Sequence, residues 1–165
     1  MAMTTFDDLD SSFEEGKTED FIKISSKLKK VNDTQNEEPL LVYLTRLLGS
    51  DESSDKEDIF KHLVSKGWKL DVQDDSGRTP LSNLAFNNNL HYFNLLVELG
   101  ADINFAGDGE APIERAIRSN DSIEVAKFIF SNPKYVSLPS GSLSDVAKSS
   151  GAKKSMALLK DLKIK

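Results

Sequence analysis

Residues 70–104 contain the pattern that most restricts how this chain can fold. The stretch is LDVQDDSGRTPLSNLAFNNNLHYFNLLVELGADIN. Thr79 can cap a helix with its hydroxyl, and Pro80 suits the first helical turn because an N–H there would have no partner within the helix. Gly77 and Gly100 permit the backbone conformations that a tight turn and a helix end require. The pattern predicts a turn, a short helix, a second helix and a stop.

This arrangement resembles the ankyrin repeat, a unit of about 33 residues in which a β-turn finger precedes two helices. The spacing from Thr79 to Asn104 fits the family pattern without an insertion or a deletion. The residues that carry the resemblance are Asp74, Gly77, Thr79, Pro80, Leu81, Ala85, Leu95, Leu96, Val97 and the closing run from Gly100 to Asn104. The resemblance implies stacking, because one repeat cannot bury its apolar face alone.

The resemblance extends, more weakly, over nearly the whole chain of 165 residues, which suits a single domain. It implies an all-α ankyrin-repeat solenoid of about five helix-turn-helix repeats with short β-turn fingers, degenerate at both ends. We expect one ankyrin-repeat domain over residues 1–165, with approximate repeats 5–34, 35–70, 71–103, 104–137 and 138–165.

Two repeats depart from this pattern. In the second, we expect the first helix to cover EPLLVYLTRLL, with Pro39 and Leu40 in the Pro-Leu positions. The following segment GSDESSDKED, residues 49–58, is longer than the usual inter-helix turn and is expected to be an acidic, solvent-exposed loop. In the fourth repeat, Ala111 replaces the capping Thr, which predicts a weaker helix start.

The sequence offers little for catalysis or for metal binding. It contains no cysteine, and its two histidines, His62 and His91, fall in different predicted repeats without a zinc-ligand spacing. Its serines lack the G-x-S-x-G context of a nucleophile elbow, and its acidic pairs fall on predicted turns rather than in an apolar pocket. We therefore expect neither an enzyme, nor a cofactor, nor a metal site.

The charge balance excludes some classes of partner. Twenty-seven acidic against twenty-one basic residues give a net charge of −6, which disfavours nucleic acid. Residues 7–20 are rich in Asp and Glu and residues 148–165 in Lys, which we interpret as solvated ends of an elongated molecule. No run of apolar residues is long enough to span a membrane, and the start lacks the features of a secretory signal. We expect a cytoplasmic protein, monomeric when free, whose partner protein has a basic surface.

Ankyrin repeats as a family bind proteins through finger tips and the exposed face of the first helices. Phe86 stands out, because an aromatic side chain near Arg115 and Arg118 matches the composition of binding hot spots. The alternative is that Phe86 turns inward beside Leu84. Transferred by position, the family's surface predicts these partner-binding residues: Thr45, Arg46, Asp75, Ser76, Arg78, Asn83, Phe86, Asn87, Asp108, Glu110, Arg115 and Arg118.

The resulting functional hypothesis is a non-catalytic module that binds a protein through its concave face and finger tips. One alternative is an immunity or inhibitor protein that neutralises a cognate toxin or enzyme, which the small size and acidic charge favour. A second alternative is a scaffold, an adaptor or a host-directed effector.

Overall fold

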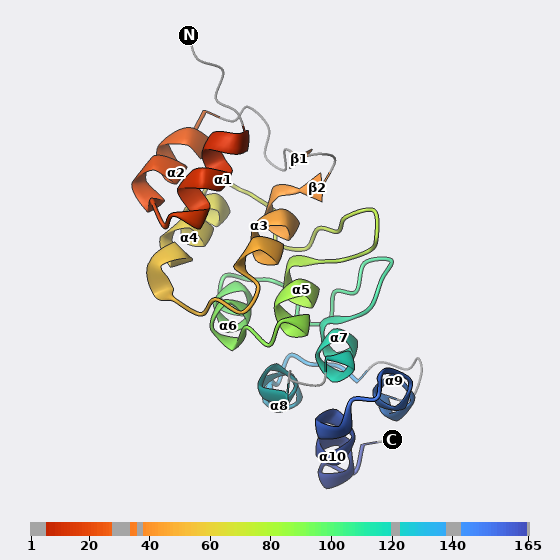
Figure 1. Cartoon of the computed structure of the whole chain (residues 1–165). Helices are drawn as coiled ribbons and strands as arrows, with labels where there is room; N and C mark the ends of the chain where they lie inside the picture. Colours follow the sequence, from red (N-terminus) through yellow and green to blue (C-terminus); the bar gives the residue numbers. More distant parts are fainter. Residues whose placement is uncertain (1–5, 28–33, 36–37, 120–122, 138–142, 165) are drawn as a thin grey trace.

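The computed structural model describes residues 6–27, 34–35, 38–119, 123–137 and 143–164. Within these residues the chain forms ten α-helices that follow one another in pairs along an elongated stack (Figure 1). The helices are α1 (Phe6–Glu14), α2 (Thr18–Ser25), α3 (Leu40–Leu48), α4 (Glu57–Ser65), α5 (Pro80–Phe86), α6 (Leu90–Glu98), α7 (Pro112–Arg118), α8 (Ile123–Ser131), α9 (Leu143–Ser150) and α10 (Lys153–Asp161). The predicted all-α array of helix pairs is confirmed. A short hairpin of β1 (Thr34–Gln35) and β2 (Glu38–Pro39) precedes α3.

The helices form two layers. The inner layer contains α3, α5, α7 and α9, in which α5 packs between α3 and α7. The outer layer contains α4, α6, α8 and α10, which contact one another in that order, while α2 packs on α4. Buried apolar side chains form one cluster that runs from Leu9 in α1 to Leu159 in α10, so successive pairs share a core.

Aromatic side chains connect successive helix pairs through this core. Phe13 in α1 lies 6.2 Å from Phe60 in α4, measured between ring centroids. Phe60 lies 5.4 Å from Tyr92 in α6. The neighbouring Phe93 then lies 5.9 Å from Phe128 in α8, with the rings edge to face. Aromatic contacts of this kind contribute about 0.5–1.5 kcal/mol beyond the area they bury, so they favour one arrangement of neighbouring pairs.

Helix α5 begins as the sequence predicts. The Thr79 hydroxyl accepts a hydrogen bond from the Ser82 N–H at 3.1 Å, and the Ser82 hydroxyl accepts one from the Thr79 N–H at 2.8 Å. These two bonds satisfy N–H groups that a helix start otherwise leaves without partners. At α7, the side chain of Ala111 has no acceptor for an N–H of the first turn, but the Glu114 carboxylate accepts from the Ala111 N–H at 2.8 Å. This start therefore keeps one of the two bonds.

The predicted alignment of the second repeat is wrong by one residue. Helix α3 begins at Leu40, and Pro39 is the residue before the helix, in the position that Thr79 occupies before α5. Pro39 has an extended conformation (φ −58°, ψ 134°) and pairs with Thr34 in the β1–β2 hairpin. A proline tolerates both the first helical position and the extended position before it, so the Pro-Leu pair did not determine the register.

The segment 49–58 is more than the exposed loop predicted from its charge. Residues 50–55 are exposed, but the segment then forms a 3₁₀ turn (Ser54–Lys56) and the first residues of α4. The Asn89 side chain donates to the carbonyls of Gly49 at 3.1 Å and Asp51 at 2.8 Å. The Tyr92 hydroxyl accepts from the Lys56 N–H at 3.2 Å and donates to the Ser53 carbonyl. The segment is thus fastened to the next helix pair by buried polar groups.

Neighbouring fingers approach each other closely. Gly77 has φ +72°, and a Cβ added there would lie 2.6 Å from the backbone nitrogen of Gly109 in the next finger. The Gln73 side chain joins the same two fingers, because it donates to the Asp108 carboxylate at 2.5 Å and accepts from the Asp108 N–H at 2.7 Å. Glycine is required at position 77 because φ is positive there and because the backbone of the next finger leaves no room for a Cβ.

Gly77→Ala is expected to destabilise the fold more than Gly67→Ala. Gly67 also has a positive φ, +85°, but a Cβ there meets nothing within 4 Å. Gly67→Ala should therefore cost about 1–2 kcal/mol of backbone strain, and Gly77→Ala at least about 1 kcal/mol more from the clash. Urea unfolding of both variants measures the difference, and equal losses would show that the fingers separate without cost.

The pH dependence of stability should include a contribution from Asp51. Hydrogen bonds from Ser53, then from Lys56, lower the pKa of Asp51 from 3.8 to about 2 in the folded chain. The ionised form is thus favoured by folding, so its contribution is fully present above about pH 5 and is lost as the pH falls through 3.8 toward 2. Asp51→Asn keeps an acceptor oxygen but removes the charge. The stability difference between wild type and Asp51→Asn should shrink in acid; a constant difference from pH 6 to pH 2 would contradict this.

Candidate functional site

Three inner helices present side chains at equivalent positions. The residues before helices α3, α5 and α7 are Pro39, Thr79 and Ala111. Counted from these residues, the last turns of the three helices carry one row of side chains: Arg46, Phe86 and Arg118. The segments entering the helices carry a second row: Glu38, Arg78 and Glu110. We call these two rows, with Tyr43 and Arg115, the inner face. Because the helices stack side by side, residues of one row become neighbours.

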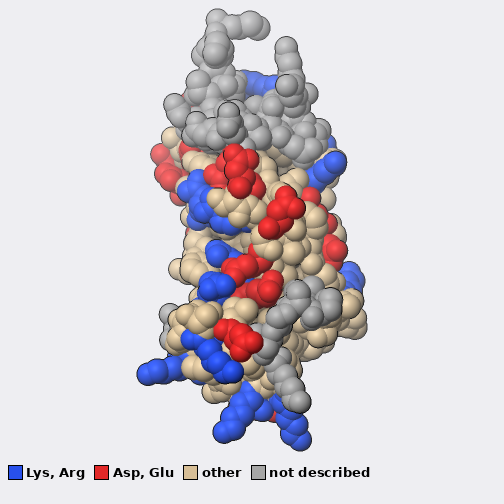
Figure 2. Space-filling view, turned by 90° about the vertical axis from the view of Figure 1, so that its right-hand side faces the viewer, with Lys and Arg blue, Asp and Glu red and all other residues tan. Residues whose placement is uncertain are grey.

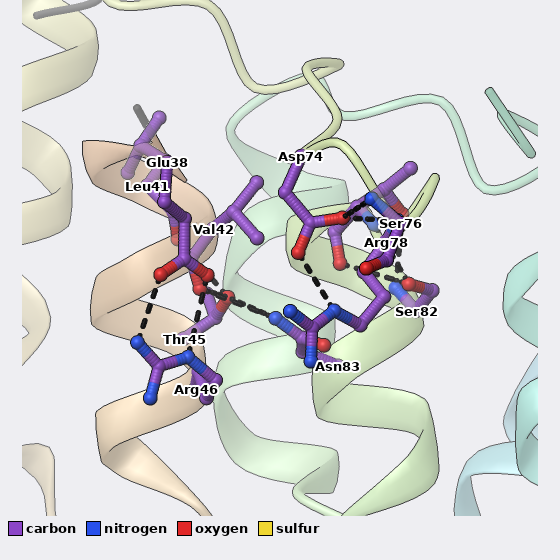
Figure 3. A network of polar contacts seen from close by, with 11 residues as sticks. Glu38, Leu41, Val42, Thr45, Arg46, Asp74, Ser76, Arg78, Ser82 and Asn83 are labelled. Atoms are coloured by element: carbon purple, nitrogen blue, oxygen red, sulfur yellow. Dashed lines mark hydrogen bonds and ion pairs between the residues drawn. The ribbon is translucent and has the colours of Figure 1, made fainter. Parts of the chain in front are cut away.

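Each arginine of the two rows is paired with a carboxylate of its own repeat. Arg46 Nη2 lies 2.8 Å from Glu38 Oε2, and Arg78 Nε lies 2.7 Å from Asp74 Oδ2 (Figure 3). Arg118 pairs with Glu110, with Nε 2.9 Å from Oε1 and 3.1 Å from Oε2. The hydrogen bond that Arg46 donates to Glu38 raises the pKa of Arg46, and the one that Arg118 donates to Glu110 raises the pKa of Arg118. The pairs hold charged groups in place on a partly exposed surface.

Aromatic rings pack against the guanidinium groups of Arg115 and Arg46. Arg115 lies over the ring of Phe86, 4.3 Å from its centroid, and Arg46 lies 5.0 Å from the centroid of Tyr43. Burial, and then the hydrogen bond that the Tyr43 hydroxyl donates to Asp10 at 2.7 Å, raise the pKa of Tyr43 to about 12. Phe86 is 41% exposed, so it does not turn into the core beside Leu84. Its neighbour in the next repeat is Arg115, as expected from sequence.

Two residues predicted to be exposed on this face are buried. Thr45 is 0% exposed and donates to the carbonyls of Leu41 at 3.0 Å and Val42 at 2.9 Å. Its assignment was wrong because of the one-residue shift: Thr45 is equivalent to the buried Ala85. Asn83 is 5% exposed and donates to the Val42 carbonyl at 3.2 Å, which fastens α5 to α3 (Figure 3). Neither side chain is available to a partner.

The finger tips hold three of the four remaining predicted residues. Asp75, Ser76 and Asp108 are exposed, whereas Asn87 is half-buried at the end of α5. Sequence reasoning missed the role of Asp74, whose buried carboxylate accepts from the N–H groups of Ser76 and Arg78, each at 2.9 Å. A carboxylate two residues before a Ser and three before a Gly was a usable signal for such a turn. The binding role of the exposed residues stays a prediction.

A hollow lies on the outer layer, between α4, α6 and α8. Its volume is about 540 Å³. Leu90, Leu95 and Phe128 supply apolar walls, and His91 Nε2 lies 2.9 Å from Glu57 Oε1 at the rim. The other lining residues are Glu52, Asn94 and Glu98. Across the described ranges, no group of three or more His, Cys, Asp or Glu side chains is placed to hold a metal ion.

Charged side chains are distributed unevenly over the molecule. On the side that faces right in Figure 1, acidic and basic groups are interspersed over the middle repeats, and Lys and Arg gather toward the α9–α10 end (Figure 2).

Among the helices that the structure describes, none is long and apolar enough to cross a bilayer.

Asn83→Ala should lower stability rather than act on binding alone. It removes a buried donor to the Val42 carbonyl, for which we expect a loss of about 1–2 kcal/mol in the free energy of unfolding. Asn87→Ala, on the same helix but only half-buried, should change stability by less than about 0.5 kcal/mol. Urea titration monitored by circular dichroism compares the two. Similar values for both variants would contradict the structural role of Asn83.

Comparison with known families agrees with this architecture. A family model described as ankyrin repeats (3 copies) matches residues 51–138, slightly more than half of the chain. No curated protein matches the chain as a whole or in part. The matched region includes the capped start of α5, the stacked fingers and the helix pairs α5–α6 and α7–α8. The chain therefore belongs to the ankyrin-repeat family.

Proposed function

We propose that this chain is a non-catalytic module that binds a partner protein through its inner face and finger tips. Ankyrin repeats are generally protein–protein interaction modules. The observation that carries the proposal is the stack of Arg115 on the exposed Phe86, which lies between the arginines of two neighbouring repeats. Aromatic and arginine side chains dominate the energy of many interfaces, since both bury a large area with few lost degrees of freedom.

The paired arginines add rigidity to this surface. Arg46, Arg78 and Arg118 are each held by a carboxylate of their own repeat, and each remains partly exposed. Exposed ion pairs contribute about 0–1 kcal/mol to folding, so stability alone does not account for three of them in adjacent repeats. Arginines already fixed in position lose less entropy when a partner binds. The carboxylates of the inner face thus serve to position guanidinium groups rather than to act on a substrate.

A second candidate surface is the hollow between α4, α6 and α8. Glu52, Glu57 and Glu98 surround its apolar wall, and this combination suits a lysine or arginine of a partner. The net charge of −6 predicts a partner with a basic surface, and such a partner would fit this hollow better than the inner face. An inhibitor or immunity protein that masks a basic enzyme would use such a surface, whereas a scaffold would use both faces.

Affinity capture with two matched variants tests the proposal. The full chain serves as bait, in parallel with Phe86→Ala/Arg115→Ala/Arg118→Ala for the inner face and Glu57→Gln/Glu98→Gln for the hollow. Proteins retained by wild type should be lost with the inner-face variant and kept with the hollow variant, because only the first loses the arginine and aromatic contacts.

Both variants must keep the wild-type circular dichroism spectrum and melting temperature within a few degrees. The reverse pattern, with loss restricted to the hollow variant, would refute the inner-face assignment and support the basic-partner alternative. Retention by both variants would exclude both surfaces.

A further inference from the structure

We infer that the inner face recognises a carboxylate of its partner, an Asp or Glu side chain that binds the guanidinium of Arg115 beside the ring of Phe86. This inference rests on the proposed function, because it names the chemistry of the partner at the same face. It opposes the prediction from net charge, which favours a basic partner.

Arg115 is the inner-face arginine whose hydrogen-bond donors are least satisfied. Its nearest carboxylate oxygen, Glu110 Oε2, lies 3.7 Å from Nη1, beyond hydrogen-bond reach. Its Nε has no partner among the residues described and is shielded from solvent, so a carboxylate of a partner would bind the Nη groups of the partly exposed side chain. By contrast, Arg46 donates from both Nε and Nη2 to Glu38, at 3.3 and 2.8 Å. A half-buried guanidinium with unsatisfied donors gains the most from an added acceptor.

The local carboxylates are engaged elsewhere. Glu110 accepts from two nitrogens of Arg118. Glu114, on the same helix as Arg115, accepts from the Ala111 N–H at 2.8 Å and holds the helix start. Asp74, across the repeat boundary, accepts from the Arg78 guanidinium at 2.7 Å and from two finger N–H groups. None of the three can turn to Arg115 without breaking a bond that orders its own finger or helix.

Neighbouring groups act on Arg115 and hold it in place. Burial lowers the pKa of Arg115 and the charges of Arg118 and Arg78 act in the same direction, whereas Glu110 raises it. Arg78 and Arg118 are paired with Asp74 and Glu110, so Arg115 has the most distant carboxylate of the three. The Phe86 ring, 4.3 Å below the guanidinium of Arg115, fixes its plane. A planar, immobilised guanidinium matches the bidentate geometry of a carboxylate.

The exposed part of Phe86 specifies what should accompany this carboxylate. Because 41% of the residue is open to solvent, an apolar side chain next to the acidic one would cover the ring edge. The fitting partner is a protein segment with an Asp or Glu adjacent to an apolar residue. The net charge of the chain acts at long range on the rate of encounter, whereas the contact itself is decided by these donors.

A displayed library of random peptides, selected on the full chain, tests this inference with a defined probe. Enriched peptides should share an Asp or Glu next to an apolar residue. Replacing that residue by Asn or Gln in the synthetic peptide should weaken binding about tenfold or more. With Arg115→Ala, the acidic and amide peptides should bind equally. Lys127→Ala removes an exposed cation on α8, outside the inner face, that pairs with Glu124 at 2.9 Å, and it should preserve the acidic preference.

The outcomes separate this inference from the proposed function. Peptides that depend on Phe86 but bind equally with Glu or Gln would overturn the carboxylate inference and leave the inner face as the binding surface. Peptides indifferent to both Phe86→Ala and Arg115→Ala would overturn both proposals. Enrichment of Lys or Arg, or of no residue type, would also refute the carboxylate. Each variant is first checked by urea unfolding, so that loss of binding is not mistaken for loss of fold.

Discussion

Stacking between neighbouring helix pairs is the constraint on which the rest of this structure depends. A pair such as α5–α6 leaves apolar side chains on both sides, and these are buried only because α3–α4 and α7–α8 cover them. The aromatic contacts from Phe13 through Phe60, Tyr92 and Phe93 to Phe128 cross three such boundaries. The contact of Arg115 with Phe86 on the inner face is a consequence of this stacking, because it joins side chains of two neighbouring repeats.

Hydrogen bonds between side chains and backbone determine how neighbouring helix pairs align. Apolar contacts are not directional, so alone they would allow one pair to shift relative to the next. Asn83 bonds to the Val42 carbonyl, Asn89 to the carbonyls of Gly49 and Asp51, and Tyr92 to the Ser53–Lys56 turn. The side chains of Asn83, Asn89 and Tyr92 are buried, so a displaced alignment would leave them unsatisfied at a cost of about 1–3 kcal/mol each. These bonds align the pair α5–α6 with the pair α3–α4. Between the next two repeats, the Gln73 side chain binds Asp108 in a comparable way.

The inner face illustrates how one helical position can serve either folding or binding. Asn83 and Arg115 occupy equivalent positions in α5 and α7, and both point toward the preceding repeat. The amide is short and reaches a backbone carbonyl, so it is buried. The guanidinium is longer and rests on an aromatic ring, so it remains at the surface. Whether this helical position serves folding or is available for binding therefore depends on the length of its side chain and on the group that it meets in the preceding repeat.

The fold and part of the candidate site could be predicted from sequence. Thr79 and Ser82 form the helix start that their types predict, and Phe86 is exposed next to Arg115. The prediction failed where a residue type is compatible with two positions. Pro39 fits either side of a helix start, and this ambiguity placed Thr45 on the surface instead of in the core. The prediction for the acidic segment 49–58 considered only its charged side chains. It could not show that backbone carbonyls of this segment accept hydrogen bonds from Asn89, or that Lys56 is buried.

By itself, the sequence determined the repeated helix pairs, because caps, glycines and apolar spacing act over a few residues along the chain. Tertiary structure alone decided which side chains meet between repeats and which donors remain unsatisfied. The guanidinium of Arg115 lies over the ring of Phe86 in the preceding repeat, 4.3 Å from its centroid, and no local pattern specifies that contact. It depends on distances between side chains that only the stacked repeats bring together.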